Sequence, residues 1–225
     1  MAKAKTRAQA RLRSRNKILN VAEKNFATLS YSGTSLRDIA TEANVPLALI
    51  YYYFESKARL YEEVLERHVG KLNASRIEEL DRLRVTNAPL DPVLRDLVTP
   101  LIDYAFRGGA TTRRFTMLLA RIFFGSDKES VELVKRHFDP LATRFIDEFT
   151  RVLPNLDRRT LAWLYTFSIG AAIGSLASED RVERLAPGEE RLTAEEIEQL
   201  AVTFVVGGAK AVARACSRQP EVAES

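Results

Sequence analysis

The side chains best suited to chemistry in this sequence lie between residues 34 and 57. Three consecutive tyrosines, Tyr51 to Tyr53, are followed by Phe, an acid, Ser and Lys57, and Arg37 lies upstream. Hydroxyl, guanidinium and ammonium groups are those with which proteins bind phosphates and the edges of bases. Successive helical positions are about 100° apart, so the three rings would spread over roughly 200° of a helix. One buried face cannot hold all three, and at least one ring must point outward.

Side chains that could catalyse a reaction are not arranged for it. The sequence contains no G-x-S-x-G, no P-loop and no G-x-G-x-x-G motif. His68 and His137 have no cysteine or second histidine at metal-ligand spacing. Adjacent acids such as Glu62–Glu63 lie on different faces of a helix. We therefore expect no enzyme, no bound metal and no cofactor.

Charge is unevenly distributed along the chain. Residues 1–60 carry 11 Lys and Arg against 4 Asp and Glu, and the first acid is Glu23. A basic end on an otherwise mildly acidic chain favours a polyanionic partner, with a solvated tail as the alternative. The single cysteine, Cys216, excludes an intrachain disulfide. No apolar run approaches membrane-spanning length and the basic start lacks the core of a signal peptide, so we expect a cytoplasmic protein that does not enter the membrane.

The apolar pattern predicts helices almost throughout and no strand. A first helix begins in the basic arm and ends before Ser32. Two short helices, 35–42 and 46–53, follow, with Thr34 or Ser35 as the N-cap of the first and Asn44 at the turn between them. Ser56 is expected to cap a long helix. Further helices are expected from Pro89 with a kink at Pro100, then over about 111–124, 129–152, 157–178 and 193–217, with a flexible loop at 179–192.

A helix followed by two short helices with a three-residue connection has the layout of a helix-turn-helix, whose last helix lies in the DNA major groove. The segment TSLRDIATEANVPLALIYYYFESKARLYEEVL resembles the N-terminal domain of TetR-family transcriptional repressors. The elements that carry the resemblance are Thr34-Ser35, Ile39-Ala40, Asn44-Val45 in place of the usual Gly-Val, and Tyr51 to Lys57. About 50 residues match, and the remainder resembles the family only in length and helical content.

The resemblance implies an all-α protein of about nine helices in two parts joined by a helix. Residues 1–60 would form the helix-turn-helix DNA-binding domain with its basic arm, and residues 61–225 a ligand-binding and dimerisation domain. It also implies a homodimer through the last two helices, acting as a repressor on a near-palindromic double-stranded DNA operator and released by a small-molecule effector. Activation, and a DNA binder without sequence preference, stay open as alternatives.

The resemblance also assigns the DNA contacts. Tyr51 falls on the side of the short helix that carries Leu47 and Ala48, and Tyr52 flanks it. Positions 47–49 are apolar where relatives usually place Ser, Lys, Gly or Thr, so we expect contacts with thymine methyl groups beside the Tyr51 hydroxyl. The basic arm would lie along or inside an adjoining minor groove.

Two cations complete this assignment. Lys57 matches the family's phosphate-binding lysine, and Arg37 a position that often reaches a base. A salt bridge to Asp38 or Glu42 is the alternative for Arg37. The residues expected to contact DNA are Thr34, Ser35, Arg37, Pro46, Leu47, Ala48, Tyr51, Tyr52 and Lys57.

The larger part offers candidates for an effector site. Arg121 interrupts the apolar run 117–124, and a charge there needs either a partner or a ligand. Asp103 is the partner that the sequence offers. A weak similarity of FGSDKESVELVKRHFDPLATRF to members that sense fatty acids or acyl-CoA implies an apolar or acyl effector. The candidate ligand-binding residues are Tyr104, Arg121, Phe124, Trp163 and Phe167, with core packing as the alternative for the aromatic ones.

Overall fold

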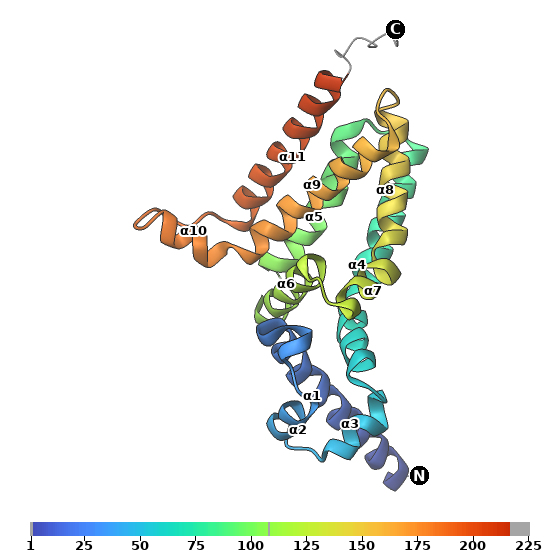
Figure 1. Cartoon of the computed structure of the whole chain (residues 1–225), viewed down its shortest axis with the longest axis vertical. Helices are drawn as coiled ribbons and strands as arrows, with labels where there is room; N and C mark the ends of the chain where they lie inside the picture. Colours follow the sequence, from blue (N-terminus) through green and yellow to red (C-terminus); the bar gives the residue numbers. More distant parts are fainter. Residues whose placement is uncertain (1, 108, 217–225) are drawn as a thin grey trace. The chain divides into compact units, whose positions relative to one another are not determined.

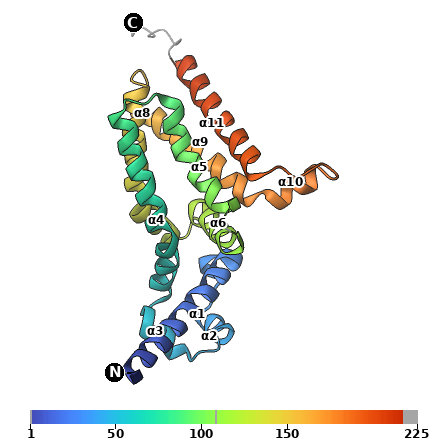
Figure 2. The same ribbon diagram turned by 180° about the vertical axis from the view of Figure 1, so that it is seen from behind.

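The computed structural model describes residues 2–107 and 109–216 (Figures 1 and 2). The prediction of an all-α chain is confirmed, although these residues form eleven helices and not about nine. The helices are α1 Ala2–Gly33, α2 Leu36–Glu42, α3 Leu47–Phe54, α4 Lys57–Val85, α5 Leu90–Arg107, α6 Gly109–Phe124, α7 Lys128–His137, α8 Asp139–Val152, α9 Arg158–Ala177, α10 Glu179–Leu185 and α11 Ala194–Cys216.

The chain forms two compact units. Unit 1 contains the described residues up to Lys71 together with Arg113–Arg136, and unit 2 contains Leu72–Thr112 and the described residues from His137 onward. The two compact units meet within α4 after Lys71, and most of α6 and α7 joins the N-terminal helices in unit 1. The sequence had not indicated that residues 113–136 belong there. The predicted functional division at residue 60 stays a prediction.

Two stretches differ from the predicted helices for identifiable reasons. The helix predicted over 129–152 is divided at Phe138, which leaves helical geometry, and Pro140 opens α8 because it has no N–H for a continuing helix. The predicted loop at 179–192 begins instead with α10. Pro100 lies inside the single helix α5, as predicted. The predicted end of the last helix at residue 217 lies outside the described residues.

Unit 1 has a core of its own beneath the two short helices. The apolar stripe of α1 faces buried side chains from α2, α3 and the first turns of α4; these residues are Ile18, Leu19, Ala22, Phe26, Ile39, Ile50, Phe54, Leu60 and Tyr61. Phe26 and Tyr61 have ring centroids 4.6 Å apart. Each large apolar side chain contributes about 1.5–3 kcal/mol by burial. Helices as short as α2 and α3 are stable only with such packing.

Unit 2 is a bundle in which α5 packs against α8, α9 and α11, and α9 packs against α8 and α11 (Figure 1). The buried side of α5 carries Val93, Leu94, Leu97, Val98, Leu101 and Ile102. α11 begins with reciprocal hydrogen bonds between Thr193 and Glu196, in which each side chain accepts from the other residue's backbone N–H. None of the helices described is long and apolar enough to span a membrane.

Candidate DNA-binding surface

A tight connection fixes α3 relative to α2. The Ser35 hydroxyl accepts from the backbone N–H of Arg37 at 3.1 Å and caps α2, which settles the choice of N-cap. Asn44 adopts φ 48°, in the left-handed region that asparagine tolerates, and the Val45 N–H donates to the Ala40 carbonyl at 3.0 Å. Pro46 precedes the first residue of α3. The two short helices are thus joined as a helix-turn-helix requires.

The three tyrosines of α3 do not share one buried face, as their spacing predicted. Ile50 and Phe54 are buried, whereas Tyr51 is 50% and Tyr52 65% exposed. Tyr53 is half-buried, and its hydroxyl donates to the Arg11 carbonyl at 3.3 Å. Among the described residues, nothing hydrogen-bonds to the Tyr51 hydroxyl. This outer face of α3 is therefore open to a partner.

The polar residues before and within α2 fall into two groups. Thr34 is buried and donates its hydroxyl to the Ser30 carbonyl at 2.7 Å, so it lies apart from the exposed face. Arg37 is exposed, and its guanidinium makes no ion pair with any described residue. Its expected alternative partner Glu42 instead binds Lys24 at 2.6 Å. Arg37 is thus available to an anion or a base edge.

Lys57 follows α3 at the start of α4 and is held against an aromatic ring. Its Nζ lies 4.4 Å from the centroid of Tyr31, a cation–π contact. Burial lowers the pKa of Lys57, while the carboxylates of Glu129 and Asp127 act in the opposite sense. This ring contact could not be predicted, because Tyr31 is far from Lys57 along the chain.

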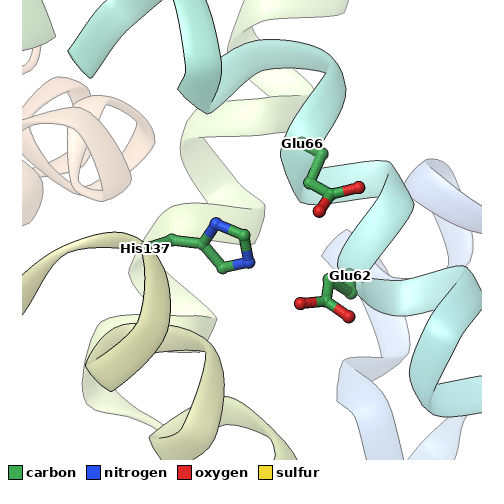
Figure 3. Close-up of side chains that lie close together, drawn as sticks. All are labelled: Glu62, Glu66 and His137. Carbon is green, nitrogen blue, oxygen red and sulfur yellow. The ribbon is translucent and has the colours of Figure 1, made fainter. Parts of the chain in front are cut away.

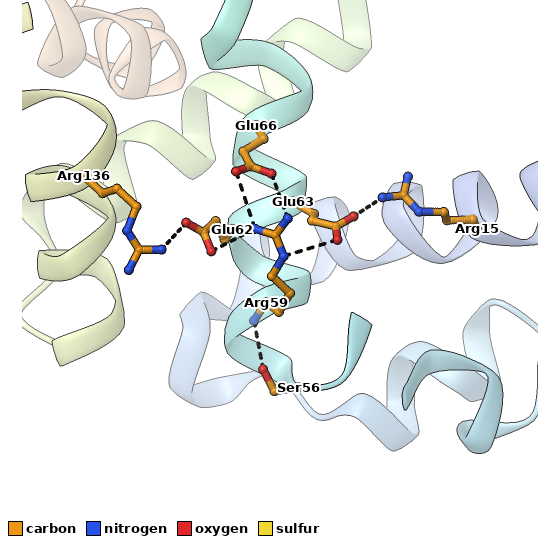
Figure 4. A network of polar contacts seen from close by, with 7 residues as sticks. All are labelled: Arg15, Ser56, Arg59, Glu62, Glu63, Glu66 and Arg136. Atoms are coloured by element: carbon orange, nitrogen blue, oxygen red, sulfur yellow. Dashed lines mark hydrogen bonds and ion pairs between the residues drawn. The ribbon is translucent and has the colours of Figure 1, made fainter. Parts of the chain in front are cut away.

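A network of charges secures the first turns of α4 (Figure 4). Arg59 lies within 3.0–3.5 Å of three carboxylates, those of Glu62, Glu63 and Glu66. Glu62 and Glu66 project from successive turns of α4 (Figure 3). Glu63 also pairs with Arg15 of α1, and Glu62 with Arg136 of α7. These contacts fix α1 and α7 to α4 within unit 1.

The same network affects the basic arm. Arg15 is engaged by Glu63, and its guanidinium lies 5.3 Å from the ring centroid of Phe54. Arg11, Arg13 and Lys17 remain exposed on α1. These three cations are the part of the arm, among residues with described side chains, that could attract a polyanion.

Arg121 and Asp103, the predicted pair, each have a partner within their own unit. Arg121 donates from Nε to the Ala27 carbonyl at 2.6 Å and from Nη2 to the Thr28 carbonyl at 2.7 Å. Asp103 binds Arg107 at 3.0 Å. A guanidinium thus satisfies carbonyls near the end of α1, just before the non-helical Ser30. The charge of Arg121 within the apolar run is therefore hydrogen-bonded to backbone carbonyl groups.

The aromatic candidates for an effector site are divided between the two units. Phe124 is exposed on α6 in unit 1, and Tyr104 is half-buried on α5 in unit 2. Trp163 and Phe167 of α9 are exposed and stacked at 5.5 Å between centroids. They line an open hollow together with Val212 of α11. An exposed apolar face on the last long helices suits contact with another protein surface.

Sequence reasoning missed two charged residues in the core of unit 2. Arg76 stands in the apolar stripe of α4, and Asp96 lies among the buried residues of α5. The signal that could have found them is a charge interrupting an apolar stripe, the criterion applied to Arg121.

Comparison with known families accounts for both parts of the chain. Residues 18–64 match the model described as bacterial regulatory proteins of the tetR family, and residues 95–208 match the tetracyclin repressor-like C-terminal domain. The chain belongs to the TetR family. TetR-family proteins are transcription regulators and not enzymes, in agreement with the predictions of DNA binding and of no catalysis.

Individual relatives support this membership of the TetR family. The transcriptional repressor NicS of Pseudomonas putida is 35% identical over 105 residues, 47% of this chain and 48% of the relative. The regulator AcrR of Shigella flexneri is 33% identical over 121 residues, 53% of this chain and 52% of AcrR. The chain thus spans about half the length of the curated relatives that it matches.

Solved structures share the fold. FadR of Bacillus subtilis, in complex with stearoyl-CoA, has a TM-score of 0.62 at 14% identity, covering 85% of this chain and 97% of FadR. A transcriptional regulator of Saccharomonospora viridis in complex with choline has a TM-score of 0.56 at 17% identity, covering 86% and 96%. At these identities the comparison concerns the fold alone.

Proposed function

We propose that the protein is a homodimeric transcriptional repressor that binds a near-palindromic operator and is released by a small-molecule effector. The observation that carries the proposal is the exposed face of α3, with Tyr51 and Tyr52 outward on a helix whose back is buried. In each subunit α3 enters one major groove. The contacts are expected from Ser35, Arg37, Pro46, Leu47, Ala48, Tyr51, Tyr52 and Lys57.

The proposed contact residues fall into three groups according to the part of the DNA that each can bind. Tyr51 and Arg37 carry hydrogen-bonding groups without partners among the described residues, so they are assigned to base edges. Leu47 and Ala48 offer apolar contact to thymine methyl groups. Ser35 and Lys57 lie at the starts of α2 and α4, where backbone N–H groups also favour a phosphate.

Dimerisation is assigned to α9 and α11. Trp163 and Phe167 on α9 and Phe204 on α11 are all exposed. A two-fold pairing of these helices would bury their rings in a four-helix bundle. This face is better suited to a second subunit than to an enclosed effector, so Trp163 and Phe167 are moved from the effector site to the dimer interface.

The effector acts by binding more tightly to one relative arrangement of the two helix-turn-helix domains in the dimer. It can shift the balance between DNA-bound and released states only by its differential affinity for them. We assign the effector to unit 2. The stearoyl-CoA and choline bound by the FadR and Saccharomonospora viridis proteins support an organic effector without choosing its class.

The test is capture of fragments of the source genome on the purified protein at near-physiological salt, followed by sequencing. Enrichment of a few fragments that share an inverted repeat is the expected result. Uniform recovery, without a shared site, would contradict a sequence-specific repressor and point to a DNA binder governed by the basic arm.

A further inference from the structure

Tyr31 follows a break in α1, and the backbone around it is constrained. Ser30 has φ 67° and ψ 176°, outside the helical region, so the helix kinks immediately before Tyr31. The Thr34 hydroxyl donates to the Ser30 carbonyl at 2.7 Å, and the Thr34 backbone N–H donates to the Tyr31 carbonyl at 3.3 Å. A serine with positive φ is uncommon and persists only where its surroundings enforce it. The direction in which the Tyr31 side chain leaves the backbone is therefore fixed by unit 1.

The Tyr31 ring belongs to an aromatic cluster built by α1 and α4. Its centroid lies 5.1 Å from that of Tyr61 and 6.2 Å from that of Phe26. Both of these neighbours are buried, whereas Tyr31 is half-buried, so the cluster is anchored in the core of unit 1 and reaches the surface at Tyr31. The Tyr31 hydroxyl has no hydrogen-bond partner among the described residues. Ring packing therefore sets the orientation of the Tyr31 side chain.

Lys57, the first residue of α4, lies against this ring. Its Nζ is 4.4 Å from the Tyr31 centroid, and the negative face of an aromatic ring attracts a cation at that distance. None of the three N–H groups of the ammonium is bound to an oxygen of a described residue. The ring covers one side of the ammonium, so N–H groups remain for an acceptor on the other side. The contact holds Lys57 in place without using up its capacity to bind an anion.

Two carboxylates near the start of α7 act on both Tyr31 and Lys57. Burial and then the carboxylates of Glu129 and Asp127 raise the pKa of Tyr31. Burial lowers the pKa of Lys57, and the same two carboxylates oppose that effect. Asp127 is committed to α7, because it accepts from the backbone N–H and from the hydroxyl of Ser130 at 2.9 Å each. The two acids thus favour the charged ammonium, but neither forms an ion pair with Lys57.

We propose that Tyr31 is a positioning residue for DNA binding, whose ring holds the Lys57 ammonium ready to bind a DNA phosphate. An unsupported lysine side chain samples many conformations and loses that freedom when it binds, whereas Lys57 is ordered beforehand. Because phosphate contacts set the position of a protein on the duplex, the contact also helps to place α3 in its groove. The inference rests on the proposed function, since it explains how one of the proposed DNA contacts is prepared.

The test is a series of substitutions in the full-length protein, with DNA affinity measured on a duplex carrying the captured inverted repeat and on a scrambled duplex. Tyr31→Leu should weaken operator binding by at least about fivefold, because both lysines of the dimer must then be ordered on binding. Tyr31→Phe is the matched control, since it keeps the ring face and loses only a hydroxyl without a partner among the described residues, and it should retain the affinity of the unmodified protein.

Two further variants show whether Tyr31 acts through the lysine. In a Lys57→Gln background, Tyr31→Leu should have no further effect, because the ring then has no cation to hold. Replacing Tyr31 by pentafluorophenylalanine keeps the shape of the ring but removes the negative potential of its face. This replacement should therefore weaken operator binding as Tyr31→Leu does.

Three results would overturn the inference. Operator binding by Tyr31→Leu that equals or exceeds that of the unmodified protein would mean that the ring does not prepare Lys57 for DNA, or withholds it. An equal loss for Tyr31→Phe, or an equal loss in the Lys57→Gln background, would mean that the ring acts through the fold of unit 1. If Tyr31→Leu does not melt cooperatively, the pentafluorophenylalanine variant decides in its place.

The same measurements separate the inference from the proposed function, which is tested by operator capture with the unmodified protein. A protein that captures an inverted repeat but is unaffected by Tyr31→Leu loses the inference and keeps the proposed function. If no repeat is captured, the proposed function fails. The series on the scrambled duplex then still decides whether Tyr31 prepares Lys57 for a phosphate, because a phosphate contact does not depend on sequence.

Discussion

The hydroxyl of Tyr51 allows DNA reading to be separated from folding. Because this hydroxyl has no partner among the described residues and the ring is 50% exposed, Tyr51→Phe should change the free energy of unfolding by less than about 0.5 kcal/mol. A specific base contact contributes about 1–3 kcal/mol, and a dimer would lose two of them, about 2–6 kcal/mol. Since 1.4 kcal/mol corresponds to tenfold in Kd, operator affinity should fall by about 25-fold or more.

Fluorescence anisotropy would measure this loss on a labelled duplex carrying the captured inverted repeat and on a scrambled duplex of equal length and charge. The loss should be confined to the operator. Tyr53→Phe is the matched control, because the Tyr53 hydroxyl is bound to the Arg11 carbonyl and should not alter the ratio of the two affinities. Unchanged operator affinity for Tyr51→Phe, or an equal loss on both duplexes, would refute base reading by this hydroxyl.

Three further perturbations test other parts of the structure. Arg121→Met removes two charge-assisted hydrogen bonds to carbonyls of α1 and should lower the free energy of unfolding by about 1–3 kcal/mol in urea titrations; no change would mean that water replaces the guanidinium. Burial raises the pKa of Asp96 to about 7, so this carboxyl group binds its proton more tightly in the folded protein than in the unfolded chain. The protein should therefore lose stability as pH rises from about 4 to about 7. Melting temperatures of Asp96→Asn should show less of that decline, and an identical pH profile would contradict the raised pKa. Replacing exposed Arg11 and Arg13 by Gln removes four cations per dimer. The slope of the logarithm of the DNA-binding constant against the logarithm of salt concentration should then fall in magnitude by up to about 4. An unaltered slope would mean that the arm is a solvated tail.

Much of unit 1 could be predicted because its signals are local. Ile50 and Phe54 lie one helical turn apart and share the buried face, whereas the outward position of Tyr51 is what the resemblance implied. A cap at Thr34 or Ser35 and a left-handed Asn44 follow from the conformational preferences of those residues. The division between α7 and α8 at Phe138 was harder to predict. Pro140 is compatible with the first turn of a new helix, but the apolar pattern does not change at this point.

The contacts that could not be predicted join residues far apart in the sequence. Arg121 binds carbonyls more than ninety residues earlier, and a backbone carbonyl carries no sequence signal. Lys57 rests on Tyr31 for a similar reason, since only the packing of α1 against α4 brings them together. Arg76 was different. It interrupts the apolar stripe of Leu72, Leu80 and Leu83, so its burial is indicated by the local sequence pattern.

The exposure of Trp163 has a spectroscopic consequence. It is the only tryptophan of the chain, is 56% exposed on α9, and stacks on Phe167, so the indole fluorescence of the whole protein arises from the proposed dimer face. Emission should shift to shorter wavelength as protein concentration rises through the dissociation constant, with no label attached. A spectrum independent of concentration, in a range where sedimentation shows monomers becoming dimers, would place the subunit contact elsewhere. The protein thus carries a built-in optical reporter of its own assembly.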